Sequence, residues 1–249
     1  MASKRIVIIG GTSAIAQHCA RLWADREAVE IILVGRIEAS LDRLARDLVV
    51  RYPGVLCSTL VSSFLDPAAI LQTVESICRP GFPDIILIAH GSLPEQRDVE
   101  KDLALCHETL EINGISPVLF AEAFASCANP ETEAKIVLIG SVAGDRGRKS
   151  NYVYGAAKGL IARYAEGLQH RFAGSRLRII LVKPGPTDTP MTERFKGQGL
   201  KLAPVETVAQ QIVIGIDQGK AAFYAPSHWA IIMRVIRHLP RFIFNRLHI

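Results

Sequence analysis

Short apolar runs recur along the whole chain, and several of them are apolar at every position. Ile6–Ile9, Ile85–Ile88 and Ile136–Ile139 are examples. A strand with one face in water alternates apolar and polar residues, so unbroken apolar runs indicate strands that are covered on both faces. The pattern predicts strands at Arg5–Ile9, Glu30–Val34, Val55–Val61, Ile85–Ala89, Lys135–Ile139, Leu177–Val182 and Ala222–Ala225.

Helical patterns separate these strands. Apolar residues recur at helical spacing in Ser40–Arg51, and Asp66 followed by Pro67 is typical of a helix start, which predicts a helix over Pro67–Cys78. Strands that alternate with helices predict an α/β fold with a doubly wound, seven-stranded parallel sheet. In such sheets the ligand binds at the carboxyl ends of the strands, where the strand order reverses.

The composition indicates one domain with a short tail. The 249 residues are 49% hydrophobic, which supplies one large core, and no long Pro-, Gly- or Ser-rich linker divides them. We predict a domain over 1–226 and a basic, amphipathic, helical tail over 227–249. No nucleic-acid partner is expected, because most of the net charge of +5 belongs to the tail rather than to a binding face. The tail has no Asp or Glu and contains Arg234, Arg237, Arg241 and Arg246.

The cysteines and the N-terminus bear on location. None of the five cysteines lies within four residues of another, so we expect buried free thiols in a reducing compartment and no metal site. The apolar run Ile6–Ile9 is too short for a signal peptide, and no stretch reaches the roughly 20 apolar residues of a spanning helix. The expected location is the cytoplasm, at the inner face of the membrane if the tail binds lipid.

The first strand runs into a turn that suits a phosphate group. A phosphate bound at a helix N-terminus needs close backbone approach and free amide donors. Gly10 permits a tight turn, and small side chains follow at the start of a helix from about Ala14. Such a turn can also be a plain strand–helix connection, but here it is the first one of a doubly wound sheet. We therefore predict a nucleotide-binding turn of Gly10, Thr12, Ser13, Ala14 and Ile15.

The residue after the second predicted strand bears on the choice of cofactor. Sites that prefer NAD place an acid there to hold the ribose 2′-hydroxyl, and an acid would repel a 2′-phosphate. The chain has Arg36 instead, whose guanidinium group suits a phosphate. We therefore predict NADP (NADPH) rather than NAD, the alternative being that Arg36 is a solvated surface arginine.

Candidate catalytic residues lie in the second half of the chain. Ser141 follows the fifth predicted strand, and Tyr154 and Lys158 are four residues apart, on one face of a predicted helix. A phenol can protonate a carbonyl oxygen, and a nearby ammonium favours the phenolate, so we expect Lys158 to lower the pKa of Tyr154. Ser141 can orient the same oxygen. Tyr152 has no lysine four residues further on, so we assign it to packing or to the substrate pocket.

These motifs resemble the short-chain dehydrogenase/reductases over about Lys4–Ala225. The TGxxxGxG turn of that family falls on Ile9, Gly10, Ala14 and Ala16, so only its first glycine is kept. The resemblance implies a Rossmann-like fold and an active-site tetrad. In this tetrad the Asn kinks its helix and holds a water that relays protons to the lysine. The tetrad maps onto Asn113, Ser141, Tyr154 and Lys158.

The resemblance also implies cofactor contacts. The Pro-Gly motif after the sixth strand seats the nicotinamide, with Thr189 near the carboxamide. Two positions depart from the family: His90 replaces an Ala in its NNAG segment, and Ser63 replaces an acid that commonly holds the adenine. We interpret His90 as a buried, hydrogen-bonded side chain rather than a catalytic one. The implied contacts are Phe64, Ala89, His90, Gly91, Tyr154, Lys158, Pro184, Gly185, Thr187 and Thr189.

The turn, the Ala-His-Gly segment and the tail look most like one branch of the family, the decaprenylphosphoryl-2-keto-erythro-pentose reductases, which reduce a keto sugar on a polyprenyl phosphate. The tail itself has two readings: a helix pressed onto an anionic membrane, or a contact between subunits of a homodimer or homotetramer. Pro240 should break its helix. Residues 192–203 are rich in Lys and Gly and are predicted to begin a mobile substrate lid.

The sequence thus predicts an NADP(H)-dependent oxidoreductase that reduces a ketone, with Tyr154 as the proton donor, or that catalyses the reverse reaction. The branch resemblance implies a keto sugar as the substrate, linked to a lipid. The other enzymatic reading is a cytosolic carbonyl reductase for a small soluble ketone, whose tail only joins subunits. A cofactor-binding scaffold without turnover is a third reading, and the presence of both Tyr154 and Lys158 argues against it.

Overall fold

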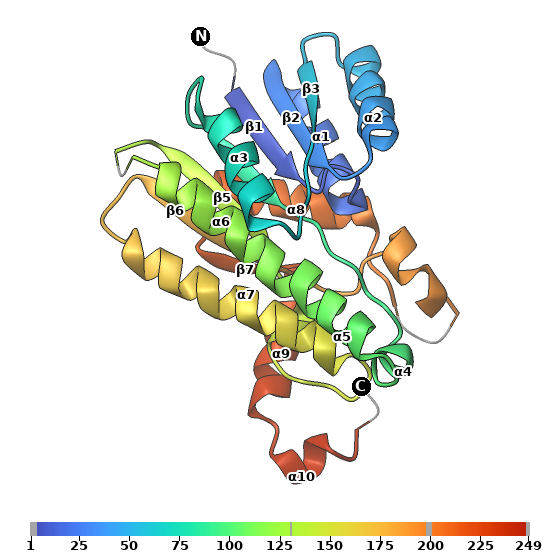
Figure 1. Ribbon diagram of the computed structural model, residues 1–249. Coiled ribbons are helices and arrows are strands. Elements are labelled where there is room, and N and C mark those ends of the chain that lie inside the picture. The colour runs from blue at the N-terminus through green and yellow to red at the C-terminus, as the bar shows by residue number, and fades with distance from the viewer. Residues whose placement is uncertain (1–3, 130, 198–200, 248–249) are drawn as a thin grey trace.

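The computed structural model describes residues 4–129, 131–197 and 201–247. Seven parallel strands form one sheet in the order β3-β2-β1-β4-β5-β6-β7, so the order reverses between β1 and β4 (Figure 1). The doubly wound sheet predicted from the sequence is confirmed. The strands are β1 (Lys4–Ile9), β2 (Val29–Gly35), β3 (Leu56–Val61), β4 (Ile85–Ile88), β5 (Ala134–Ile139), β6 (Leu177–Pro184) and β7 (Ala222–Ala225).

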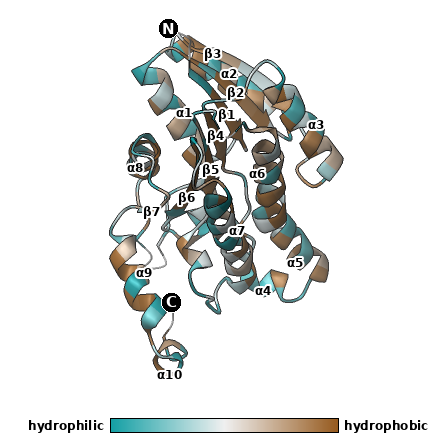
Figure 2. Cartoon of the chain, turned by 90° about the vertical axis from the view of Figure 1, so that its left-hand side faces the viewer, coloured by the Kyte–Doolittle hydropathy of each residue, from teal (hydrophilic) through white to brown (hydrophobic). Residues whose placement is uncertain are grey.

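Helices cover both faces of this sheet (Figure 2). One face packs against α1 (Ala14–Arg26), α2 (Glu38–Arg51) and α8 (Val205–Asp217). The other packs against α3 (Pro67–Cys78), α6 (Ser116–Cys127) and α7 (Tyr152–Arg171). Shorter helices are α4 (Gln96–Val99), α5 (Leu103–Leu110), α9 (Trp229–His238) and α10 (Arg241–Phe244), and the single turns are η1 (Glu111–Ile115), η2 (Val142–Gly144) and η3 (Pro190–Phe195).

The unbroken apolar strands have the physical cause that the sequence suggested. In β1, Ile6 and Ile8 belong to the core under α1 and α2, whereas Val7 and Ile9 belong to the core under α3 and α6. Alternate side chains thus enter two different cores, and both must be apolar. The two edge strands depart from this rule, since Leu56 and Val61 of β3 and Ala222 of β7 are exposed. All five cysteines are free thiols, but only Cys19 is fully buried and the other four are half-buried.

The C-terminal tail forms two short helices that project from one end of the domain (Figures 1 and 2). Pro240 separates α9 from α10, as its sequence position predicted. Met233 is the one fully buried residue of α9. No helix in the described ranges combines the length and apolarity needed to cross a bilayer. Of the predicted lid over 192–203, residues 192–195 lie in the turn η3, and residues 198–200 lie outside the described residues.

Candidate active site

A cavity of about 680 Å³ opens at the carboxyl ends of the strands, where the strand order reverses. The structure places every site residue predicted from the sequence in its wall, from Gly10 in the first turn to Thr189 after β6. Tyr152 is not among the lining residues and is 46% exposed, so its assignment to packing or to the pocket was wrong. The side chain points outward because Tyr154 and Lys158 occupy the inner face of the same helix.

The turn after β1 is fixed by a close backbone approach. Gly10 has φ +88, and a Cβ on it would lie 2.7 Å from the backbone nitrogen of His90. Such a conformation and such a distance exclude any larger residue. Ser13 occupies the N-cap of α1 but makes no side-chain capping hydrogen bond. Its side chain and that of Thr12 line the cavity instead.

Arg36 follows β2 and lies at the rim of the cavity. Its side chain is exposed, and within the described ranges it makes no hydrogen bond or ion pair. Its guanidinium group is therefore available to a ligand. A phosphate is the group that an arginine fork binds best, so the rim of the cavity suits the 2′-phosphate of NADP.

His90, after β4, is a buried member of the cavity wall. Its Nε2 lies 2.9 Å from the Ser116 hydroxyl, and its ring packs against Phe64 at 4.6 Å and Phe120 at 5.7 Å. Burial, together with the positive charges of Lys158 and Arg36, lowers the pKa of His90 to about 3. The imidazole is therefore neutral near pH 7, in agreement with the structural role predicted for it.

Asn113 lies in the π-helical turn η1 between α5 and α6. Its side chain is fully buried, and its Oδ1 accepts a hydrogen bond from the Ser92 backbone N–H at 2.9 Å. Its Nδ2 donates to the Thr109 carbonyl at 2.9 Å. The π turn widens the helix at this point and turns the amide toward the loop after β4. This irregularity agrees with the kink that the family resemblance implied.

The other three tetrad residues meet at the start of α7. Ser141 follows β5 and hydrogen-bonds the Tyr154 hydroxyl, while its Oγ also accepts the Ala143 N–H at 3.1 Å. Lys158 is buried, and its Nζ donates to the Ile139 carbonyl at 3.0 Å. Burial without an opposite charge lowers the pKa of Lys158 to about 8.

We expected Lys158 to lower the pKa of Tyr154, and this prediction was wrong. Its Nζ lies 5.7 Å from the centre of the tyrosine ring and points to a backbone carbonyl. Burial dominates instead and raises the pKa of Tyr154 to about 12, while the hydrogen bond with Ser141 acts in the opposite direction. The phenol is therefore protonated near pH 7. This is the form that donates a proton, as the reduction of a carbonyl requires.

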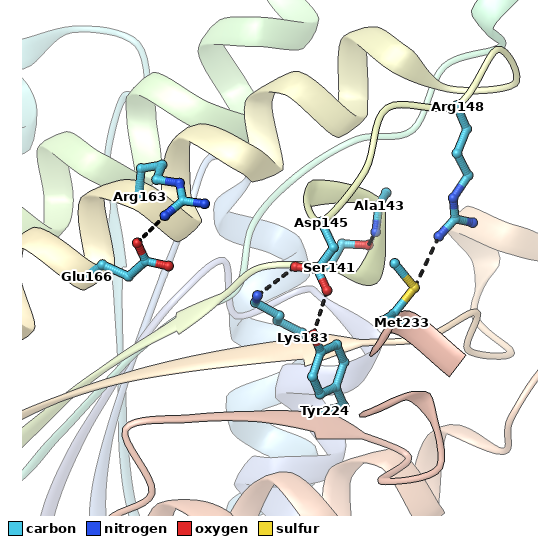
Figure 3. A network of polar contacts seen from close by, with 9 residues as sticks. All are labelled: Ser141, Ala143, Asp145, Arg148, Arg163, Glu166, Lys183, Tyr224 and Met233. Atoms are coloured by element: carbon cyan, nitrogen blue, oxygen red, sulfur yellow. Dashed lines mark hydrogen bonds and ion pairs between the residues drawn. The ribbon is translucent and has the colours of Figure 1, made fainter. Parts of the chain in front are cut away.

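Several residues of the site were not found from the sequence. Trp229 of α9 lines the cavity, and its Nε1 would lie 2.1 Å from a Cβ on Gly185. Arg148, in the loop before α7, also lines the cavity and points toward Met233 (Figure 3). The tail, which the sequence separated from the domain, thus contributes to the wall of the site. In the sequence, the aromatic residue Trp229 at the start of the tail was the one sign of this contact.

A second polar cluster supports the loop that carries Ser141. Asp145 accepts hydrogen bonds from the Lys183 ammonium and the Tyr224 hydroxyl, both at 2.6 Å (Figure 3). The Asp145 side chain is only 3% exposed. Because an ion pair out of water is costly to break, the cluster holds the loop against β6 and β7.

Comparisons with known proteins agree with this geometry. A family described as short chain dehydrogenase matches residues 4–198. The chain is 27% identical over 245 residues to an uncharacterized oxidoreductase of Streptomyces coelicolor, covering 98% of this chain and 96% of that protein. It is 29% identical over 247 residues to an uncharacterized oxidoreductase of Mycobacterium tuberculosis, covering 97% and 96%.

A solved structure shares the fold at low identity. It is a short-chain dehydrogenase from Sphingobium yanoikuyae in complex with NADPH, with a TM-score of 0.82 and 22% identity, covering 98% of this chain and 96% of that one. The family match spans most of the described domain, including the turn after β1 and the tetrad. The chain therefore belongs to the short-chain dehydrogenase family of NAD(P)-binding oxidoreductases.

Proposed function

We propose that this protein uses NADPH to reduce a ketone to an alcohol. The observation that carries the choice of NADPH is Arg36, an exposed arginine without a partner among the described residues, at the position where an acid would select NAD. The similar Sphingobium yanoikuyae structure is a complex with NADPH. The neutral phenol of Tyr154 supports the direction of the reaction, because reduction needs a proton donor.

The cavity fits a dinucleotide along its whole length. The turn after β1 lines the cavity and can present its backbone to a diphosphate, because Gly10 allows the tight turn before the N-terminus of α1. Thr12 and Ser13 line the cavity there, and Arg36 lies at its rim. Pro184, Gly185 and Thr189 line the other end, beside the tetrad. When bound there, NADPH supplies a hydride to the carbonyl carbon of the substrate.

The residues of the tetrad then handle the proton. Ser141 and Tyr154 are hydrogen-bonded to each other, so their two oxygens can hold the substrate carbonyl oxygen together. Tyr154 donates its proton to that oxygen. Lys158 and Asn113 line the same cavity, and Lys158 donates a hydrogen bond to the Ile139 carbonyl. These two residues return a proton to Tyr154 through a relay.

Titration of the protein with NADPH and NADH tests the proposal. We expect NADPH to bind about tenfold or more tightly than NADH, which corresponds to about 1.4 kcal/mol. Arg36→Ala should erase this preference. Arg43→Ala, at another exposed arginine in the second turn of α2, should leave it unchanged. If neither nucleotide binds, the proposed function is wrong. Binding without turnover of any ketone favours the scaffold reading instead.

For the substrate we propose a keto sugar linked to a lipid phosphate. The support is the surface of the tail. Ile231, Val235 and Phe242 are between 58% and 73% exposed, and the tail presents four exposed arginines, three on these two helices and one after α10. A surface of apolar side chains with cations and no acids suits an anionic bilayer, where each cation contributes about 1 kcal/mol. Trp229 connects this surface with the cavity.

Sedimentation with phosphatidylglycerol vesicles tests this part. We expect the wild type to bind and to be released by salt, and Phe242→Asp to abolish binding. Leu103→Asp is a matched control, because Leu103 is 85% exposed but lies on α5. If the wild type does not bind vesicles and Phe242→Asp changes the oligomeric state, the tail is a subunit contact, and the substrate is a small soluble ketone.

A further inference from the structure

The charged residues of the cavity wall do not balance. Among the described lining residues Glu95 is the single acid, against four cations, namely Arg36, Arg148, Lys158 and Arg194. Arg36 lies at the end that the adenosine would occupy, and Lys158 donates to the Ile139 carbonyl. Arg194 pairs with Glu95 at 2.8 Å. Arg148 is the cation that these assignments leave unexplained.

The surroundings of Arg148 do not neutralise it. Its Nη2 donates to the Met233 sulfur at 3.6 Å, and a thioether is a weak acceptor. Its Nε is buried and has no hydrogen-bond partner among the described residues. The nearby carboxylate of Asp145 already accepts hydrogen bonds from Lys183 and Tyr224. Burial lowers the pKa of Arg148, although Asp145 opposes this.

Burying a guanidinium group without an anionic partner costs free energy. An anionic ligand that pairs with it therefore gains more binding free energy than it would from an arginine at the surface. Arg148 precedes Tyr154 by six residues, and both line the same cavity. Ser150 and Asn151, which lie between Arg148 and Tyr154 in the chain, also line the cavity. The Asn151 Oδ1 is another buried atom without a hydrogen-bond partner among the described residues. The polar wall around Arg148 therefore faces the space next to the proton donor.

We propose that Arg148 binds a phosphate group carried by the ketone substrate. This inference rests on the proposed function for the presence of a ketone, but binding of the anion does not depend on turnover. The anion pairs with the guanidinium group while the carbonyl oxygen lies at Ser141 and Tyr154. Arg148 is thus a residue that selects acidic substrates over neutral ones.

Calorimetric titration of the NADP⁺-loaded protein with two matched pairs tests the proposal. The first pair is glycerol 3-phosphate and glycerol, and the second is farnesyl phosphate and farnesol. In at least one pair we expect the phosphate to bind about tenfold or more tightly than the alcohol. Arg148→Gln should erase that difference and Arg148→Lys should keep part of it. Arg163→Gln, a largely exposed arginine on the outer face of α7, should leave it unchanged.

The two pairs distinguish the source of the phosphate. Binding of farnesyl phosphate alone assigns the site to a lipid-linked phosphate, and equal binding in both pairs assigns it to a soluble one. The proposal is overturned if neither phosphate is preferred, or if Arg148→Gln keeps the preference while still binding NADP⁺. Failure of the proposed function can be distinguished from failure of this proposal, because in that case the wild type would not bind NADP⁺.

Discussion

Arg146 stacks on Phe244, with its guanidinium carbon 3.8 Å from the centre of the ring. The same guanidinium group donates hydrogen bonds to the carbonyls of Ile236 and Leu239, at the end of α9. Arg146 lies five residues after Ser141, so the loop that carries a tetrad residue also holds both helices of the tail. The tail and the active site are therefore parts of one packed structure.

Replacing Arg146 should loosen the tail. Arg146→Ala removes a cation–π contact of about 1 kcal/mol and leaves helix carbonyls without a donor, so we expect a loss of about 2 kcal/mol in the free energy of unfolding. Denaturant unfolding measures this loss. Arg163→Ala is the control, because Arg163 makes only a surface ion pair with Glu166. Equal stability of the two variants would show that Arg146 does not anchor the tail.

Two glycines should respond in opposite ways to the same substitution. At Gly10 the positive φ and the contact with His90 leave no room for a Cβ, so Gly10→Ala should destabilise the protein and abolish tight NADPH binding. At Gly167 of α7 a Cβ meets nothing within 4 Å, so Gly167→Ala should stabilise the helix by about 0.5–1 kcal/mol. Thermal unfolding with and without NADPH compares them, and retention of NADPH binding by Gly10→Ala would contradict the structure of the turn.

Most of the fold could be predicted because the strands are marked by local chemistry. Ile6–Ile9 and the other unbroken runs are recognisable in the sequence alone, and Asp66 caps α3 where the Asp-Pro pair predicted, by accepting the Ala68 N–H. Ser141 follows a strand, and Tyr154 and Lys158 share one helix face, so their spacing could also be interpreted, whereas Asn113 was identified only through the family resemblance.

What the sequence could not provide depends on contacts between distant segments. Arg148 and Met233 are 85 residues apart, and Trp229 meets Gly185 across 44 positions, so no local pattern links either pair. The pKa of Tyr154 is a similar case. The spacing from Lys158 suggested a lowered value, but the three-dimensional packing sets the burial that raises it and directs the lysine to a carbonyl.

Tyr154→Phe should separate chemistry from cofactor binding. It removes the donated proton and leaves the ring, so we expect the rate of ketone reduction to fall by about 10²–10⁴-fold with little change in NADPH affinity. Steady-state rates and NADPH titration measure the two effects. Tyr152→Phe, two residues away on the exposed side of α7, is the matched control and should behave as the wild type. A variant of Tyr154 that keeps full activity would remove this tyrosine from the mechanism.

Lys158 should leave a signature in the dependence of stability on pH. Its pKa is lowered from 10.5 to about 8 by burial, so between these values the unfolded chain binds the proton that the folded protein has released. The free energy of unfolding of the wild type therefore gains a contribution that grows from about pH 8 to 10.5 and is missing at lower pH. In total it approaches about 3 kcal/mol.

Lys158→Met lacks this group, so the stability of the variant relative to the wild type should be greatest near neutral pH and should decrease as the pH rises. Denaturant unfolding of both proteins across that range isolates the contribution of Lys158, because all other ionisable groups are the same in the two proteins. A difference that does not change with pH would mean that Lys158 keeps an ordinary pKa. In that case Lys158 is not buried away from water, and its assignment to the proton relay is wrong.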